Sequence, residues 1–318
     1  MQISVIGCGR WGSFIAWYLC RIGHEVSLYG RPESGNMKRL MQTRQNDYLQ
    51  LQDGVQLTTD LACCDNTETI VISVSSQSLD GLCRILANRN LKDKTIVLCM
   101  KGMDIATGRR LSQVARDALD ASCAIAVWLG PGHVQEFYRD VPNCMVIDSE
   151  NETVVSRLVN EFSSSLIRFY YGTDLIGNEI GAAAKNVIGI AAGLLDGHGL
   201  GSLKGALMSR GTREISRLIE AMGGKAISAY GLCHLGDYEA TVFSVHSQNR
   251  LFGEKWVKGE EYGKLAEGYY TVKAFHNIAE KSRLELPICE AVYSILYEGK
   301  DAYMALESLF TRTIKNEF

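Results

Sequence analysis

The first 29 residues constrain the fold of this chain more than any other stretch. The apolar segment 2–6 reads QISVI and is followed at once by GCGRWG, after which residues 13–21 have helical periodicity. The segment 25–29, EVSLY, then returns to the pattern of a strand. A G-x-G-x-x-G sequence between a strand and a helix is typical of the first βαβ unit of a dinucleotide-binding sheet. We therefore expect an α/β N-terminal Rossmann domain with a mostly parallel, doubly wound sheet.

Each glycine of this motif has a physical role in such a turn. Gly7 permits the tight turn, Gly9 lets the backbone approach a pyrophosphate, and Gly12 allows the helix to pack closely on the strand. The helix N-terminus presents free N–H groups and the positive end of its dipole to the phosphates. Arg10 and Trp11 lie in the same turn and join the candidate cofactor-binding residues. The alternative is a glycine turn that binds no ligand.

The end of the second predicted strand bears on which nucleotide is bound. NAD-specific sites usually place an Asp or Glu there to contact the ribose 2′-hydroxyl. This chain has Arg31 at that point, and Glu33 follows two residues later. A guanidinium pairs well with a 2′-phosphate, whereas a solvated surface arginine is the alternative. The sequence therefore favours NADPH over NADH and leaves the use of both open.

Further strands continue the α/β pattern. Segments 69–74, 95–100 and 124–129 are apolar throughout or nearly so, as strands covered on both faces require. Lys101 follows the second of these strands, and Gly130 follows the third. Parallel sheets bind ligands at the carboxyl ends of their strands, so both residues are expected to face the cofactor crevice. On position alone, Lys101 is equally well interpreted as a plain surface lysine.

The chain is long enough for two domains, because it has 318 residues. Segments 143–148 and 167–171 look like the closing strands of the first domain, and the pattern from residue 172 onward is almost entirely helical. We expect a dinucleotide-binding Rossmann domain over residues 1–175 and an all-α substrate-binding domain over residues 176–318.

Residues 176–196, IGNEIGAAAKNVIGIAAGLLD, are predicted to form a buried helix. The stretch is apolar or small nearly all round, and it is too short and too interrupted by polar residues to span a bilayer. Lys185 lies in its middle. A buried ammonium is costly unless it is paired or faces a wet cleft, where it can transfer protons or bind an anion. The alternative is a lysine that reaches solvent from a partly exposed helix.

A second group of polar residues follows. Asp237 lies in a glycine-flanked segment, and Thr241, four residues later, would share its helix face. If Asp237 lies near Lys185 it would hold that ammonium in place; the alternative is an N-cap aspartate. Glu267, in a predicted loop, is a candidate contact to cofactor or substrate. Donors suited to an anion come from Ser247, Gln248, Asn249 and Arg250.

The composition argues against several classes of protein. Apolar residues at 46% and charged residues at 22% are ordinary globular values, and a net charge of −3 argues against nucleic-acid or membrane-surface binding. The spacing of the ten cysteines fits neither a zinc site nor a disulfide scaffold. Because the N-terminus reads as a strand and not as a signal peptide, we expect a cytoplasmic protein without stable membrane insertion.

Together these motifs resemble the bacterial type of NAD(P)-dependent glycerol-3-phosphate dehydrogenase, over nearly the whole chain. The resemblance rests on GCGRWG, on Lys101-Gly102, on the Gly-Pro turn at 130–131, on IGAAAKNVIGIAAG, and on the segments DGHGLG, SRGTREISRL, GLCHLGD, SQNRLFG and EGYYTVK. It implies a Rossmann domain followed by a helical domain, NAD or NADP as cofactor, and a homodimer. It also implies a role in carbohydrate metabolism and glycerophospholipid synthesis.

The resemblance further implies roles for single residues. Lys185 would be the general acid and base at the substrate C2 oxygen, and Asp237 and Thr241 would complete the catalytic pocket. Lys101 would place the substrate and contribute charge. The implied reaction is reversible hydride transfer between dihydroxyacetone phosphate and sn-glycerol 3-phosphate, without a metal. The implied substrate-binding residues are Lys101, Gly130, Lys185, Ser247, Gln248, Asn249 and Arg250.

One departure from the family pattern concerns the substrate phosphate. The family has Ser-Arg-Asn-Arg where this chain has Gln248 in place of the first arginine. A neutral amide cannot replace a bidentate guanidinium–phosphate pair, and the loss is worth roughly tenfold to a hundredfold in affinity. Either Arg250 or another cation compensates, or the enzyme reduces a different small keto or hydroxy compound. A non-catalytic NAD(P)-binding sensor is a third hypothesis.

Overall fold

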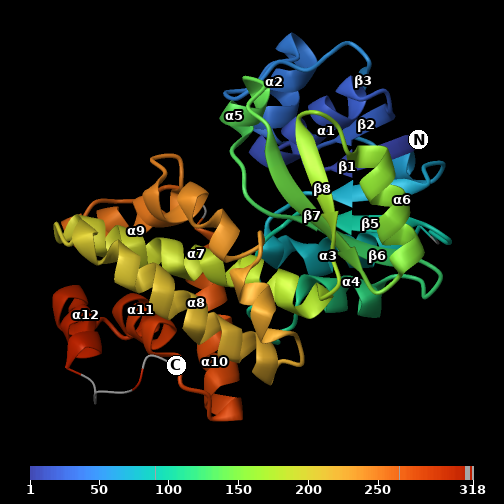
Figure 1. The fold of residues 1–318 in the computed structure, drawn as a ribbon. Coiled ribbons are helices and arrows are strands. Elements are labelled where there is room, and N and C mark those ends of the chain that lie inside the picture. Colours follow the sequence, from blue (N-terminus) through green and yellow to red (C-terminus); the bar gives the residue numbers. More distant parts are fainter. Residues whose placement is uncertain (90, 265, 312–315, 317–318) are drawn as a thin grey trace. The chain divides into compact units, whose positions relative to one another are not determined.

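The computed structural model describes residues 1–89, 91–264, 266–311 and 316. The chain divides into two compact units, each described here by itself (Figure 1). The first unit comprises residues 1–101 and 109–179, and the second comprises residues 102–108 and 180–318. The sequence analysis did not anticipate that the short segment 102–108 belongs to the second unit.

The first unit is built on one eight-stranded sheet with the strand order β3-β2-β1-β4-β5-β6-β7-β8. The order of the first six strands is that of the Rossmann fold. Neighbouring strands are parallel except β6 and β7, which are antiparallel. The strands are β1 Gln2–Ile6, β2 Glu25–Tyr29, β3 Val55–Thr58, β4 Thr69–Ile72, β5 Thr95–Leu98, β6 Ala124–Leu129, β7 Asn143–Ser149 and β8 Ile167–Tyr171.

Helices cover both faces of this sheet, as its apolar strands require. One face packs against α1, α2, α5 and α6 in a core that includes Phe14, Trp128 and Phe162. On the other face α3 packs on α4, which contacts β6. The helices are α1 Arg10–Arg21, α2 Gly35–Thr43, α3 Leu79–Ala87, α4 Leu111–Ala118, α5 Val134–Tyr138 and α6 Glu152–Phe162, with the short helices η1 Leu61–Cys64 and η2 Ser76–Ser78.

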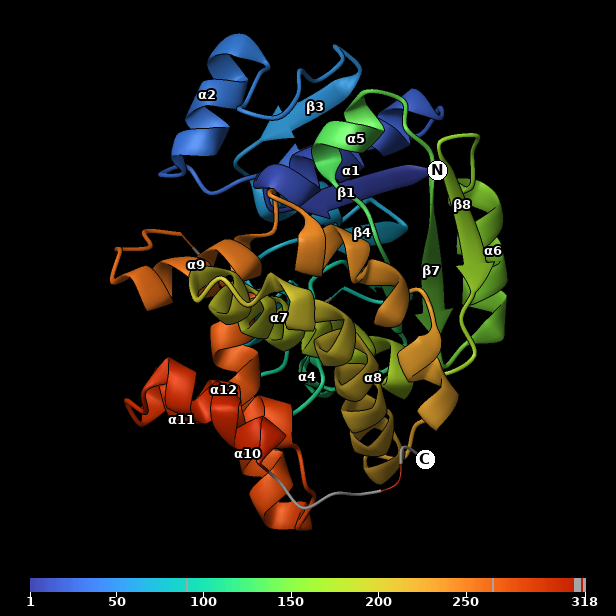
Figure 2. The ribbon, with the colours of Figure 1, turned by 60° about the vertical axis from the view of Figure 1, so that its left-hand side comes forward.

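The regular elements described in the second unit are all helical, as predicted. The helix α7, Leu175–Gly197, begins in the last residues of the first unit and continues into the second (Figure 2). The others are α8 Lys204–Ala221, α9 Gln248–Lys258, α10 Glu267–Ser282, α11 Pro287–Tyr297 and α12 Ala302–Phe310. Shorter helices are η3 Gly201–Leu203, η4 Ala226–Tyr230, η5 Leu235–Asp237 and the π-helical η6 Glu239–Phe243.

Glycines spaced four residues apart on α7 let its backbone approach α9 very closely. A Cβ at Gly193 would lie 1.9 Å from the Arg250 carbonyl oxygen, and one at Gly189 would lie 2.7 Å from the Thr241 methyl carbon. From the other side, a Cβ at Gly253 of α9 would lie 2.3 Å from the Ile190 carbonyl oxygen. No side chain fits at these contacts, so the small residues of this helix are a packing requirement.

The element bounds agree with the sequence predictions in part. β1, β2, β6 and β8 have the predicted bounds, whereas β4 and β5 each end two residues early, at Ile72 and Leu98. By length and composition α7 could cross a membrane, so the expectation that it is too short and too polar was wrong in that respect. However, 83% of its most apolar window is buried within the protein, as in a core helix.

Candidate active site

Lys185 is largely buried within the second unit. Its Nζ donates a hydrogen bond to Thr241 Oγ1 at 2.8 Å and lies 3.1 Å from Asp237 Oδ2. Its side chain is 12% exposed and that of Asp237 is 1% exposed. The ammonium is therefore paired and largely desolvated, which agrees with the functional interpretation of this lysine and not with one that extends into solvent.

Short helices set the positions of the two partners of Lys185. Asp237 is the last residue of η5, and Thr241 lies within η6. The two short helices follow each other closely along the chain, and both side chains reach the same ammonium. The packing of the Thr241 methyl group over Gly189 fixes the hydroxyl from the opposite side.

A buried histidine beside this pocket was not identified from the sequence. His234 Nδ1 lies 2.9 Å from the Gly181 carbonyl oxygen, and its Nε2 lies 2.7 Å from the Tyr238 hydroxyl. A carbonyl only accepts, so Nδ1 donates and Nε2 accepts from Tyr238. Burial lowers the pKa of His234 to about 4. A neutral imidazole therefore lies next to Asp237, and it adds no second positive charge to the pocket.

Two asparagines join α7 to the N-termini of α9 and α10. Asn249 Nδ2 donates to Asn186 Oδ1 at 3.0 Å, and Asn249 Oδ1 accepts from the Gly268 N–H at 2.9 Å. Asn249 was expected to supply a donor to an anion, and its amide already connects three helices. Asn186 follows Lys185 directly, so this junction also fixes the part of α7 that carries the lysine.

The predicted phosphate-binding segment forms the start of α9. Ser247 is the N-cap of this helix, and its hydroxyl accepts from the Arg250 N–H. Gln248 Nε2 donates to the His246 carbonyl at 3.3 Å, and Gln248 Oε1 accepts from the Tyr262 hydroxyl at 2.9 Å. The side chain that replaces the family arginine is therefore engaged by the main chain before α9 and by Tyr262 after it.

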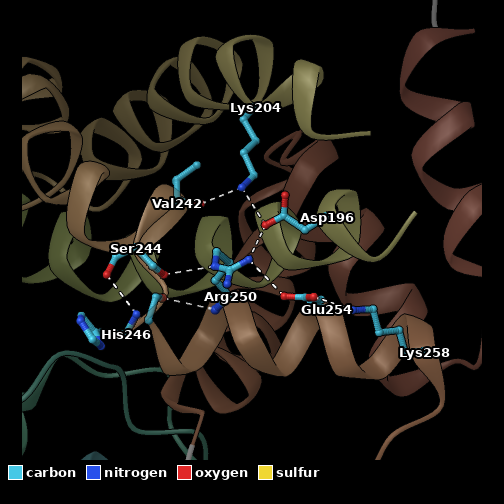
Figure 3. A network of polar contacts seen from close by, with 9 residues as sticks. Asp196, Lys204, Val242, Ser244, His246, Arg250, Glu254 and Lys258 are labelled. Carbon is cyan, nitrogen blue, oxygen red and sulfur yellow. Dashed lines mark hydrogen bonds and ion pairs between the residues drawn. The ribbon is translucent and has the colours of Figure 1, made fainter. Parts of the chain in front are cut away.

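Arg250 belongs to a network of charged groups centred on Asp196 (Figure 3). Its NH1 lies 2.6 Å from Asp196 Oδ2 and 3.2 Å from Glu254 Oε2. Lys204 Nζ lies 2.7 Å from the same Asp196 oxygen, and Lys258 pairs with Glu254 at 2.6 Å. The charge of Arg250 is thus already shared between two carboxylates.

Glu267 was predicted to lie in a loop, and this was wrong. It is the first residue of α10, after the N-cap Ala266. A carboxylate in the first turn of a helix is favourable because it faces the positive end of the helix dipole. Its contact with a cofactor stays a prediction.

In the first unit the glycine motif has the geometry of a tight strand-to-helix turn. Gly7 has a φ of +110°, and a Cβ there would lie 2.1 Å from the Ser73 carbonyl oxygen. A Cβ at Gly12 would lie 1.8 Å from the Gly7 carbonyl oxygen, whereas one at Gly9 would meet nothing within 4 Å. Gly9 is the N-cap of α1, and no side chain forms a capping hydrogen bond at this end of the helix. The turn therefore presents main-chain N–H groups on a surface free of side-chain bulk, which suits a pyrophosphate.

The other predicted cofactor residues of this unit differ in their surroundings. Trp11 packs on Phe14 and Phe137, with ring centroids 5.1 and 6.3 Å away. Arg10 lies over the Tyr48 ring at 5.8 Å. Arg31 is exposed, and its Nε lies 3.3 Å from Glu33. A weak surface pair of this kind leaves the guanidinium available to a stronger anion.

Lys101 and Gly130 come together at the carboxyl ends of β5 and β6. Lys101 Nζ donates to the Gly130 carbonyl oxygen at 2.6 Å. Gly130 has a φ of +127°, so the turn after β6 requires a glycine there. The expectation that both residues face the same edge of the sheet agrees with this contact.

Comparisons with known proteins cover both units. Residues 2–155 match the family model for the N-terminus of NAD-dependent glycerol-3-phosphate dehydrogenase, and residues 174–307 match the model for its C-terminus. A glycerol-3-phosphate dehydrogenase [NAD(P)+] from Clostridium botulinum is 35% identical over 99% of both chains. One from Chlorobium limicola is 34% identical over 100% of this chain and 99% of its own. The solved glycerol-3-phosphate dehydrogenase from Coxiella burnetii has a TM-score of 0.92, 28% identity, and 98% coverage of both chains.

Proposed function

This chain belongs to the NAD(P)-dependent glycerol-3-phosphate dehydrogenase family and interconverts dihydroxyacetone phosphate and glycerol 3-phosphate, and we propose that Lys185 is the general acid and base of this reaction. The observation that carries the proposal is the position of Lys185 Nζ between Asp237 and Thr241 in a buried pocket. An ammonium held there has a proton to give and little solvent to compete for it.

The proposed proton transfer follows the charge that develops on the substrate. Reduction of the C2 carbonyl places negative charge on its oxygen, and Lys185 donates a proton to that oxygen. In the reverse direction the neutral amine of Lys185 takes the hydroxyl proton. Asp237 holds the ammonium in place, and Thr241 orients it. The positive charge stabilises the developing alkoxide more than the ground-state carbonyl, so it lowers the barrier.

The first unit supplies groups that fit a bound dinucleotide. When bound, NAD(P)H supplies the hydride. The open space at Gly9 and the uncapped N-terminus of α1 suit its pyrophosphate. Arg10, Trp11 and Arg31 would line the adenosine side, and an exposed Arg31 supports a preference for a 2′-phosphate. Glu267, the first residue of α10, is proposed as a further cofactor contact.

Lys101 is proposed to place the substrate. Its bond to the Gly130 carbonyl holds the ammonium at the edge of the sheet where ligands of this fold bind. The proposed substrate contacts in the second unit are Lys185, Ser247, Gln248, Asn249 and Arg250. The engagement of Arg250 by Asp196 and Glu254 supports weaker phosphate binding than in relatives that have arginine at position 248.

The test is oxidation of NADPH and NADH by the purified protein, with dihydroxyacetone phosphate titrated from micromolar to millimolar concentrations. We expect saturation with the wild type, and a fall in kcat of about 10³-fold for Lys185→Ala. Lys281→Ala, an exposed change in the last turn of α10, is the matched control and should turn over like the wild type. A Lys185→Ala variant with wild-type kcat would disprove the assignment. Light scattering of the same sample tests the proposed homodimer.

A further inference from the structure

The network around Asp196 fastens the segment that carries Thr241. Lys204 Nζ donates to the Val242 carbonyl at 3.1 Å, and Arg250 Nε donates to the Ser244 carbonyl at 3.1 Å. Both cations also contact the same Asp196 oxygen, at 2.7 and 2.6 Å (Figure 3). One carboxylate therefore organises two cations, and each cation holds a carbonyl just after Thr241.

We propose that Asp196 is a positioning residue for the contact between Thr241 and Lys185, acting through Lys204 and Arg250. The proposal rests on the proposed role of Lys185. Asp196 lies 11 residues after Lys185 on α7, or about 16 Å along the helix axis, so it cannot contact the lysine itself. Its influence passes through the main chain of η6.

The negative charge of Asp196 is what allows the two cations to lie together. Lys204 and Arg250 share one carboxylate oxygen, so their charged nitrogens lie within about 5 Å of each other, where like charges repel. Their side chains are only 10% and 13% exposed, so solvent screens this repulsion little. A neutral side chain at position 196 would drive at least one cation away from its carbonyl.

The segment that these carbonyls belong to needs such anchoring. At the start of this segment the Thr241 and Val242 N–H groups share one acceptor, the Tyr238 carbonyl. Phe243, the next residue, is 52% exposed and its ring lies 5.4 Å from Lys204 Nζ. If the Val242 and Ser244 carbonyls are released, the segment loses two of the contacts that hold the Thr241 hydroxyl at hydrogen-bonding distance from Lys185, and the packing of its methyl group over Gly189 is left to position it.

The experiment compares Asp196→Asn with Glu254→Gln. Glu254 belongs to the same network but contacts neither Lys204 nor a carbonyl of η6 in the described contacts. We expect kcat to fall between about tenfold and a hundredfold in Asp196→Asn, with the cofactor KM unchanged, because a small misplacement of a catalytic contact is costly. Glu254→Gln should keep kcat within about twofold.

Hydrogen exchange provides a readout that does not depend on turnover. Amides of residues 239–247 should exchange faster in Asp196→Asn than in the wild type or Glu254→Gln, while those of α8 stay protected. Unchanged exchange in folded Asp196→Asn would overturn the proposal even if kcat fell. If the wild type lacked activity with dihydroxyacetone phosphate, the proposed function would fail, whereas the exchange result would still test the anchoring.

A double-mutant cycle with Thr241→Val separates positioning from general destabilisation. If Asp196 acts through Thr241, the double variant should be little worse in kcat than Thr241→Val alone. Fully additive losses in kcat would contradict the proposal. Should Asp196→Asn not fold, Lys204→Met replaces it in the same cycle, because it removes the contact with the Val242 carbonyl together with the pairing with Asp196 and the contact with the Phe243 ring.

Discussion

The second unit contains two buried groups of charges that serve different purposes. The described contacts of Lys185 are to side chains, those of Asp237 and Thr241. Lys204 and Arg250 instead bind main-chain carbonyls as well as a shared carboxylate. The buried pair of Lys185 and Asp237 is suited to proton exchange with a substrate, whereas the contacts of Lys204 and Arg250 fix the local main chain.

The two groups also differ in their access to solvent. Asp237 is 1% exposed, whereas the network extends from Asp196 through Glu254 to Lys258, which is 45% exposed. Charges in the dry pocket interact strongly and are costly to leave unpaired, whereas the outer pairs are screened. Substitutions at comparable carboxylates should therefore have very unequal effects.

Among changes to the carboxylates of the two groups, the largest effect is expected from Asp237→Asn. It leaves the buried Lys185 ammonium without its carboxylate, which disfavours the charged form and loosens its position. We expect kcat to fall about a hundredfold and the pH profile of kcat to move to lower pH. Glu254→Gln, at the outer end of the network, is the matched control. Equal losses in both variants would remove the distinction between the two groups.

An intermediate effect is expected from Gln248→Arg. If Arg250 is fully engaged by Asp196 and Glu254, the loop lacks a cation for a phosphate, and a guanidinium at position 248 supplies it. The KM for dihydroxyacetone phosphate should fall about tenfold, with kcat little changed. Gln248→Lys serves as a control for charge without the bidentate geometry. A KM unaffected by Gln248→Arg would mean that another cation already fills this role.

Glu214→Gln is expected to change activity least of all. It should nevertheless change stability measurably. Glu214 accepts from the N–H groups of Ile288 and Cys289, and burial raises its pKa from 4.5 to about 7. The folded state therefore binds more protons than the unfolded state between these values, so the free energy of unfolding declines as pH rises from 4.5 to 7. The decline is on the order of 3 kcal/mol.

Denaturant unfolding of both proteins at pH 5 and pH 8 measures this contribution. The free energy of unfolding of Glu214→Gln, minus that of the wild type, should be larger at pH 8 than at pH 5, because the amide does not ionise. His234 affects the pH dependence of stability in the opposite direction. Its pKa of about 4 makes the free energy of unfolding fall as the pH drops below 6.5. Both proteins contain His234, so this contribution cancels in the difference. A difference that is independent of pH would show that Glu214 does not titrate in this range.

Local patterns predicted the framework of both units but not these pairings. Alternating strands and helices, and a glycine motif at their first junction, are consequences of short-range periodicity, so β1, α1 and β2 were predictable. The antiparallel β7 and the strand β3 were not, because pairing direction depends on contacts far along the chain. Lys185 was noticeable because a charge interrupts an apolar stretch, and Asp237 because glycines flank it.

The remaining site residues left no comparable signal. Asp196 and Lys204 are ordinary charged residues in the sequence, and Arg250 was singled out only as a contact for an anionic substrate. The packing of α8 and α9 on α7 brings both cations to one oxygen of Asp196. His234 is likewise a single histidine in a loop until Gly181 and Tyr238 occupy its two nitrogens. Such roles depend on tertiary distance, which neither periodicity nor spacing encodes.

The glycines that bring α7 against α9 have a consequence for how the enzyme folds. Each interior glycine costs a helix about 1 kcal/mol relative to alanine, so a helix with Gly181, Gly189 and Gly193 has little stability in isolation. Packing against α9 must therefore supply the stability that α7 lacks as an isolated helix. Lys185, the proposed general acid and base, therefore lies on a segment that acquires its shape late, and a nascent or partly unfolded chain should hold no partial active site able to turn over substrate.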